Sequence, residues 1–206
     1  MTALSNPGDE RIAVAAAALD DRGYALITDW TRPAMARALR QDAHEHAECG
    51  RLTPAGTGRG AEQSGPRLRG DDTLWLDDPA CGTAAGDFLS ALGVLRLDLN
   101  RRLMLGMESI QAHYALYPTG AGYVRHRDRF RDDDARVLSL VCYLNPDWPL
   151  DAGGALRLHL PDGVIDIAPR TGTIVMFLSD EIEHEVMPAT QPRLSIAAWF
   201  LRSKSS

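Results

Sequence analysis

The most chemically suggestive pattern in the sequence is His126-Arg127-Asp128, which closes the segment YPTGAGYVRHRD. Side chains i and i+2 of an extended strand point to the same side, so His126 and Asp128 can contact one metal ion while Arg127 points away. A second histidine, His184, follows 56 residues after Asp128 at the start of another strand-like run. Two imidazoles and one carboxylate are the ligand set of non-haem iron(II) oxygenases, and the same set suits zinc hydrolases. The pattern therefore predicts a metal site and leaves iron and zinc open.

Arg193 favours iron over zinc. It comes nine residues after His184 and opens an apolar strand. A guanidinium at that place can bind a dicarboxylate with two parallel hydrogen bonds, whereas a hydrolase has no evident use for it. Its alternative role is a salt bridge on the rim of a barrel. The four residues together predict iron(II) chemistry with 2-oxoglutarate as co-substrate.

The other histidines are weaker candidates. His113 shares its strand face with Tyr117, so it either lines the pocket or packs as a hydrogen-bonded core residue. His44 and His46 lie two residues apart on an expected helix, hence about 200° apart around it, and are poor joint ligands. We expect both on the surface, and we expect His159 to be exposed beside a turn.

Charged residues gather after the His-x-Asp pattern. The acidic run 132–134 stands between Arg131 and Arg136, which is typical of a solvated loop rather than a magnesium site. An arginine cluster precedes the run, formed by Arg125, Arg127, Arg129 and Arg131. This cluster either steers an acidic substrate segment or is simply exposed on a strand and loop.

Composition bounds the class of protein. A chain of 206 residues with net charge -6 suits one domain and has no general attraction for nucleic acid or anionic lipid. Three cysteines without CxxC spacing indicate neither a disulfide framework nor a thiolate zinc site. No run of about 18 apolar residues and no basic, apolar leader is present. We expect a cytoplasmic protein without nucleic acid or membrane partners; the sequence indicates no oligomeric state.

Helical periodicity precedes residue 106, and a period of two follows it. Helices are expected over Asp9–Asp20, from Pro33 to about Cys49, and over Asp87–Leu105, with a surface loop over Arg51–Leu68. The stretch Arg69–Leu76 is expected to pass from a turn into a strand. The other expected strands are Tyr24–Thr28, Ser109–Tyr117, Tyr123–His126, Val137–Leu144, Ala155–His159, Val164–Ile167, Thr173–Phe177, His184–Met187 and Leu194–Leu201. The pattern predicts a mainly β (α+β) fold, a barrel or double-sheet jelly roll with N-terminal helices. We expect one domain over 1–206, with helical support and a substrate loop in 1–108 and the β core in 109–201.

Four segments carry a family resemblance: YPTGAGYVRHRD, CYLNPDW, GGALRLHLPDG and HEVMPATQPRLSIAAWF. Together they resemble the catalytic core of the prolyl 4-hydroxylase family of 2-oxoglutarate oxygenases, most closely the hypoxia-inducible-factor prolyl hydroxylases. The resemblance implies a cupin-like double-stranded β-helix that uses Fe(II), 2-oxoglutarate and O2, with ascorbate as a candidate reductant. It implies hydroxylation of a prolyl residue in a protein or peptide, with release of succinate and CO2.

The resemblance also assigns roles residue by residue. It implies that His126, Asp128 and His184 ligate iron, and that Arg193 binds the distal carboxylate of 2-oxoglutarate with help from the hydroxyl of Tyr143. The remaining positions that it matches surround the substrate: Tyr117 near the iron, Leu156 and Trp199 in the pocket wall, and Arg136 with the turn Arg69-Gly70-Asp71 beside the substrate-gripping loop.

Two departures from the family pattern keep the substrate open. The turn from Pro118 to Gly122 is one residue shorter, and the loop Arg51–Leu68 differs in composition. One alternative is a hydroxylase of a small molecule or free amino acid. Another, from a different class, is a non-enzymatic metal-binding or oxygen-sensing module.

Overall fold

The computed structural model describes residues 10–56, 68–128 and 135–203. Three helices and eleven strands lie in these ranges. Within the same ranges no helix combines the length and the apolar character needed to cross a membrane. Residues 57–67 of the expected surface loop and the acidic run 132–134 lie outside the described part of the chain.

The helices form where the sequence places apolar residues three and four positions apart. Helix α1 (Glu10–Arg22) buries Ile12, Ala15, Ala16 and Leu19 on one face and is followed by Gly23 in a left-handed conformation. Helix α2 (Pro33–Glu48) has proline in its first turn, where a missing backbone N–H costs nothing. Helix α3 (Thr83–Leu103) begins four residues before the expected Asp87.

The strands form two antiparallel sheets. The larger sheet has the order β1-β9-β6-β11-β4-β3-β2, and the smaller has the order β5-β10-β7-β8. The strands of the larger sheet are β1 (Tyr24–Ile27), β2 (Thr53–Pro54), β3 (Asp72–Trp75), β4 (Ser109–Tyr117), β6 (Arg136–Tyr143), β9 (Ile174–Leu178) and β11 (Arg193–Leu201). Those of the smaller sheet are β5 (Tyr123–His126), β7 (Leu156–Leu160), β8 (Gly163–Ile167) and β10 (Glu183–Val186).

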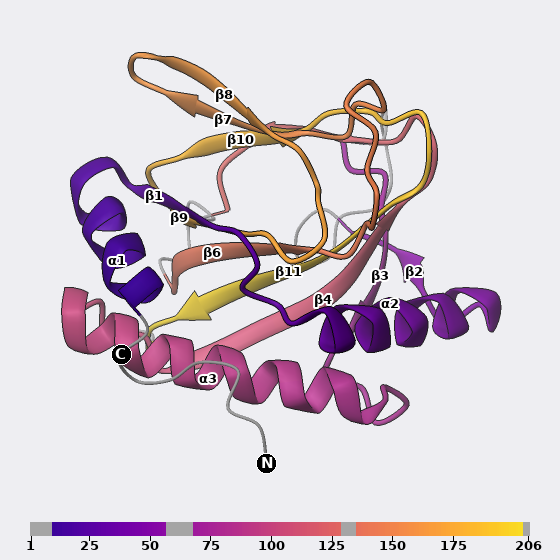
Figure 1. The fold of residues 1–206 in the computed structure, drawn as a ribbon, viewed down its shortest axis with the longest axis horizontal. Coiled ribbons are helices and arrows are strands. Elements are labelled where there is room, and N and C mark those ends of the chain that lie inside the picture. The colour runs from indigo at the N-terminus through magenta and orange to yellow at the C-terminus, as the bar shows by residue number, and fades with distance from the viewer. Residues whose placement is uncertain (1–9, 57–67, 129–134, 204–206) are drawn as a thin grey trace.

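The fold has three layers, which are the helices, the larger sheet and the smaller sheet, and an apolar core lies between each layer and the next. Figure 1 shows the helices against one side of the larger sheet and the strands of the smaller sheet over its other side. Side chains alternate along β4, so Tyr114 packs in the core beneath the helices while Ala115 and Tyr117 pack in the core between the sheets. The functional site therefore has to be sought between the sheets, where β4, β5, β10 and β11 converge.

The expected jelly-roll architecture is confirmed. The strands expected from Ser109 onward are present, and their boundaries differ from the expected ones by at most one residue. The larger sheet nevertheless crosses the expected division at residue 108, because β1, β2 and β3 are hydrogen-bonded into it. The N-terminal part thus supplies strands as well as helices.

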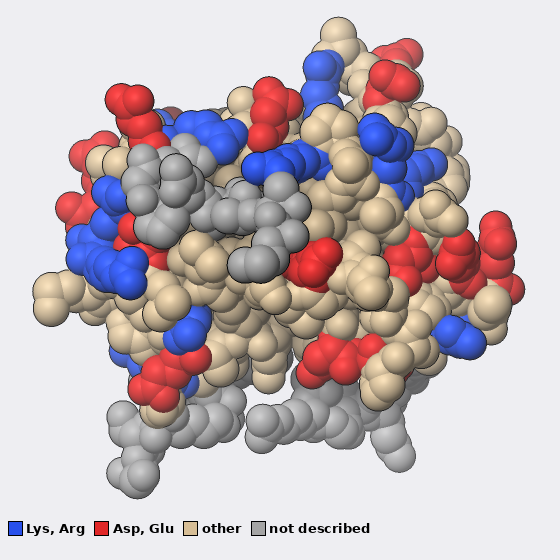
Figure 2. Space-filling view, turned by 60° about the horizontal axis from the view of Figure 1, so that its bottom comes forward, with Lys and Arg blue, Asp and Glu red and all other residues tan. Residues whose placement is uncertain are grey.

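Charges of both signs are distributed over the surface. On the face drawn in Figure 2, Lys and Arg alternate with Asp and Glu over the described residues. Several exposed or half-exposed ions are paired, as in the two-pronged contact of Arg157 with Asp166.

Asn145 links the end of β6 to the start of β11. Its amide donates to the carbonyls of Pro169 (2.8 Å) and Leu194 (2.9 Å), and its carbonyl accepts from the Leu194 N–H (2.7 Å). We expect Asn145→Ala to lower the free energy of unfolding by about 3 kcal/mol, because three buried backbone groups lose their partner. Urea denaturation measures this change. The exposed turn variant Asp162→Ala should change it by less than about 0.5 kcal/mol, and an equal effect of both variants would contradict the prediction.

Candidate active site

Strand pairing brings the two predicted histidines together. His126 ends β5 and His184 lies in β10, and the two residues are direct partners in the antiparallel ladder. Their ring centroids are 4.2 Å apart. Asp128 follows β5 by two residues, and its carboxylate oxygens lie 3.7 Å from Nε2 of each histidine. One potential ligand atom from each residue lies within 4.8 Å of the others.

Backbone contacts set the tautomers of both imidazoles. Nδ1 of His126 faces the Val124 carbonyl at 2.7 Å, and Nδ1 of His184 faces the Ile182 carbonyl at 3.3 Å. A carbonyl only accepts hydrogen bonds, so both Nδ1 atoms carry the proton and both Nε2 atoms present a lone pair. Two lone pairs and a carboxylate then face one another, an arrangement that a bound cation stabilises.

The protonation states suit metal binding. Burial and the neighbouring His126 lower the pKa of His184 to about 4, so its imidazole is neutral at neutral pH. Burial alone would raise the pKa of Asp128, but the adjacent His184 and His126 and the Ser139 hydroxyl outweigh it. The pKa of Asp128 therefore lies well below its ordinary value, and the group stays a carboxylate.

Two supporting residues were not found from the sequence. The Ser139 hydroxyl, on β6, donates to Oδ2 of Asp128 at 2.6 Å and contacts the Ser179 hydroxyl at 2.9 Å. The Tyr123 ring stacks on the His126 imidazole with a centroid distance of 3.6 Å. A serine among the apolar residues of RVLSLVCY was the available signal for Ser139, because a buried hydroxyl needs a partner.

We expect Ser139→Ala to weaken metal binding about tenfold, because the carboxylate loses the donor that orients it. The measurement is the dissociation constant for Mn2+, read from the electron paramagnetic resonance signal of the free ion. Ser195→Ala is the matched control, because Ser195 lines the same pocket but contacts Arg193. An unchanged constant in Ser139→Ala would show that Asp128 is oriented without Ser139.

Arg193 is a buried cation beside the triad. Only 1% of it is exposed, and it donates to the Gly154 carbonyl (Nε, 2.9 Å) and the Ser195 hydroxyl (NH1, 3.1 Å). Among the described residues no carboxylate lies within ion-pair distance of it. A buried, unpaired guanidinium is costly unless an anion completes the site. The arrangement fits an anionic ligand that enters from the pocket.

Two tyrosines flank this guanidinium. Its carbon lies 5.1 Å from the ring centre of Tyr117 and 5.2 Å from that of Tyr143. The Tyr143 hydroxyl is buried and has no hydrogen-bond partner in the described chain. Burial raises the pKa of Tyr143 to about 12, against the opposing charge of Arg193, so the hydroxyl remains a donor. A carboxylate oxygen would satisfy both this hydroxyl and Arg193.

The two predicted wall residues, Leu156 and Trp199, line one pocket together with the triad and Arg193. Arg69, from the turn predicted beside the substrate-gripping loop, lines the same pocket. Arg136 stands behind the wall, where its guanidinium lies 3.9 Å from the Trp199 ring centre and donates to the Asp128 carbonyl at 3.2 Å.

His113 supports this wall from outside the pocket. It is buried, and its Nε2 accepts from Arg69 at 3.1 Å while Nδ1 donates to the Tyr114 carbonyl at 2.8 Å. Arg69 in turn forms a two-pronged contact with Asp71, at 2.6 and 2.8 Å. Burial and the Arg69 charge lower the pKa of His113 to about 4. Of the two roles expected for His113, the structure places it in the packing role.

Three other histidine predictions are wrong. His44 was expected on the surface but is half-buried on α2. His46 was expected on the surface but is only 4% exposed, because its side of α2 faces the loop before α3. His159 was expected to be exposed but is half-buried, because Nε2 contacts the Glu185 carboxylate at 3.0 Å across the sheet.

Part of the arginine cluster is neutralised. Arg125 is hydrogen-bonded to Glu183, and Arg127 lies 4.0 Å from the same carboxylate, pointing away from the triad as strand alternation predicted. Arg129 and Arg131 lie outside the described residues.

Comparison with known proteins shows that the part of the chain carrying the site is similar to known oxygenases. The 2OG-Fe(II) oxygenase superfamily model matches residues 112–201. Human Egl nine homolog 1 is 28% identical over 193 residues, which are 88% of this chain and 44% of that protein. The chain spans about half the length of the mammalian proteins of that name that it matches.

Two solved structures share the fold. A Pseudomonas putida prolyl-4-hydroxylase is 40% identical with a TM-score of 0.85, covering 94% of this chain and all of that one. A Trichoplax adhaerens prolyl hydroxylase, solved with a hypoxia inducible factor oxygen degradation domain peptide fragment, is 28% identical with a TM-score of 0.83. It covers 92% of this chain and 88% of that one.

Proposed function

Because the chain belongs to the prolyl 4-hydroxylase family of Fe(II)- and 2-oxoglutarate-dependent dioxygenases, we propose that it hydroxylates a prolyl residue in a protein or peptide. The observation that carries this proposal is a converging His-Asp-His triad in the same pocket as a buried arginine without a carboxylate partner among the described residues. The triad would bind the metal, and the arginine would bind the co-substrate.

His126, Asp128 and His184 would hold iron(II). Iron bound there with 2-oxoglutarate and O2 supplies the oxidation of an unactivated C–H bond, with release of succinate and CO2. The chain's own contribution is positioning: the Val124 and Ile182 carbonyls hold the imidazole tautomers, and Ser139 orients the carboxylate. Ascorbate is the proposed reductant that keeps the iron ferrous.

Arg193 would bind the distal carboxylate of 2-oxoglutarate, with the Tyr143 hydroxyl as a second donor. Both groups are buried, so their interaction with an anion is little screened by water. Tyr117 lies beside the same guanidinium and would stand between the co-substrate and the substrate.

The substrate would lie against Leu156 and Trp199. Leu156 is apolar and the indole of Trp199 is held by Arg136, so this wall suits the apolar ring of proline. The prolyl hydroxylase from Trichoplax adhaerens was solved with a peptide fragment, which supports a polypeptide over a small molecule.

The first test measures conversion of 2-oxoglutarate to succinate without any added prolyl substrate. Purified protein, iron(II), ascorbate and 2-oxoglutarate are followed by NMR for succinate, which a purely metal-binding module would not form. A cell lysate is then treated with the wild type or with Asp128→Ala and searched by mass spectrometry for peptides that gain one oxygen atom. Gains on proline only with the wild type support the proposal. Gains confined to other residues or to small molecules would overturn the prolyl substrate.

We also propose that residues 1–206 act as one catalytic domain in the cytoplasm. Cys49, Cys81 and Cys142 are all free thiols, as is typical of proteins from reducing compartments.

A further inference from the structure

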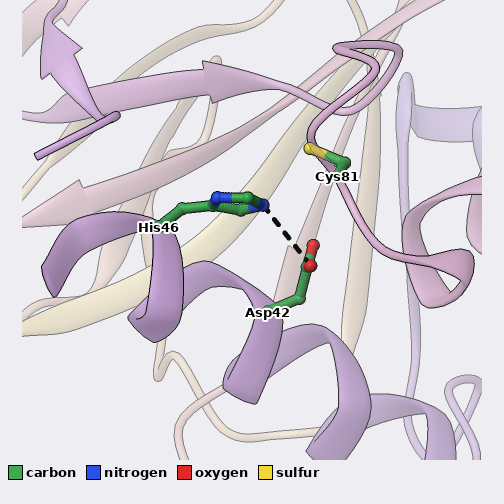
Figure 3. A group of neighbouring side chains, drawn as sticks. All are labelled: Asp42, His46 and Cys81. Atoms are coloured by element: carbon green, nitrogen blue, oxygen red, sulfur yellow. Dashed lines mark ion pairs between the residues drawn. The ribbon is translucent and has the colours of Figure 1, made fainter. Parts of the chain in front are cut away.

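A second group of potential ligands lies on the other side of the larger sheet. Figure 3 shows Asp42 and His46 on α2 and Cys81 in the loop before α3, facing a common space. The Asp42 carboxylate accepts from the Tyr114 hydroxyl at 2.7 Å, and Tyr114 belongs to the core beneath the helices. The larger sheet therefore separates this group from the triad.

The spacing of the three residues suits one ion. Asp42 and His46 are four positions apart on a helix and so project from the same face. One carboxylate oxygen, one imidazole nitrogen and the Cys81 sulfur all lie within 4.8 Å of one another. The i, i+4 pair is visible in the sequence, whereas the approach of Cys81 depends on the packing of the loop against α2.

The environment of His46 independently indicates that this group of residues binds a ligand. The residue is 4% exposed, and its Nε2 atom has no hydrogen-bond partner among the described residues. Nδ1 lies 3.2 Å from the Arg51 guanidinium, which can only donate, so Nε2 carries the proton. Nε2 points at Oδ1 of Asp42 from 3.5 Å, beyond the usual N–H···O range of about 2.7–3.2 Å.

We propose that Asp42 Oδ1, His46 Nε2 and Cys81 Sγ bind a divalent transition metal of the zinc class. Imidazole and thiolate together favour Zn2+ and its neighbours, while Mg2+ and Ca2+ require oxygen ligands. The ion would join α2 to the start of α3, where Asp42 already accepts the Gly82 N–H at 2.9 Å. The half-buried sulfur of Cys81 leaves a route for the ion to enter.

Binding releases one proton. The Cys81 thiol loses its proton to solvent as the metal–sulfur bond forms, and the imidazole proton moves from Nε2 to Nδ1 through exchange with water. Arg51 is exposed and must turn away, because Nδ1 then becomes a donor. Burial, with Asp42, Asp78 and Asp77 nearby, raises the pKa of the free thiol to about 11. Because binding releases a proton, the affinity should rise as the pH is raised.

Cobalt(II) absorption provides a selective probe, because the triad contains no thiolate. Titration with Co2+ should produce a near-ultraviolet thiolate-to-cobalt charge-transfer band in the wild type and in the triad variant Asp128→Ala. The band should be lost in Cys81→Ser and kept in Cys49→Ser, a control thiol that is exposed just beyond α2. Arg51→Ala should strengthen binding, because it removes the donor that competes for the imidazole tautomer. No band in the wild type, or equal bands in the two cysteine variants, would overturn the site.

Alkylation gives a second measurement that does not depend on any variant folding. In the native protein, Zn2+ should slow the reaction of iodoacetamide with Cys81 at least tenfold and leave that of Cys49 unchanged, as read by peptide mass mapping. Equal rates with and without Zn2+ at Cys81, or equal protection of both cysteines, would contradict the proposal.

Discussion

Replacing Asp128 by Ala is expected to reduce succinate formation from 2-oxoglutarate at least about 1000-fold, because iron bound at the proposed site would lose its only carboxylate ligand and several kcal/mol of stabilisation. The free energy of unfolding of the metal-free protein should change little, since the substitution also removes an anion that faces two imidazole lone pairs. Succinate measured by NMR with saturating iron(II) and 2-oxoglutarate tests this expectation. His126→Ala should behave in the same way.

The control for this prediction lies one residue from the triad. Glu185 follows His184 on β10 but points to the opposite face, where it contacts His159. Glu185→Ala should keep turnover within about twofold of the wild type. Succinate formation at the wild-type rate in Asp128→Ala would refute the ligand assignment.

The second large effect is expected at Arg193. Arg193→Lys keeps the charge but loses the planar fork, and with it the Nε contact to Gly154 and the NH1 contact to Ser195. We expect the KM for 2-oxoglutarate to rise at least about tenfold, equivalent to about 1.4 kcal/mol, with a smaller change in kcat. Initial rates over a range of 2-oxoglutarate concentrations measure both constants.

Two variants separate this effect from general damage. Arg157→Lys alters a guanidinium of β7 that pairs with Asp166 outside the pocket, so its KM should be unchanged. Tyr143→Phe removes a hydroxyl that has no partner in the described chain, so folding should be unaffected while the KM rises. A wild-type KM in Arg193→Lys would place the co-substrate elsewhere.

The local sequence pattern was sufficient to predict the strands of the β core. An alternation of period two is a property of each segment by itself, so β4 and β5 were predicted with their observed boundaries. The same alternation put His126 and Asp128 on one side and Arg127 on the other. Their positions at the starts of later strand-like runs then pointed to His184 and Arg193, whose contacts with the rest of the site are non-local.

Tertiary contacts decided several features that no local pattern contains. Helix α3 begins at Thr83 rather than Asp87, and the N–H of Gly82, the residue just before it, is bound by Asp42 from another helix. Burial of His46 has the same origin, since the loop that carries Cys81 packs over that face of α2.

The amino-acid sequence by itself predicted the residue types of the site: two histidines and an aspartate, the arginine, and the strands that carry them. Only the tertiary structure decided that His126 and His184 are cross-strand partners, that Ser139 reaches Asp128, and that His113 supports the pocket wall from behind. The physical reason is that side-chain direction along a strand is local, whereas the register between strands distant in sequence is set by the packing of the whole core.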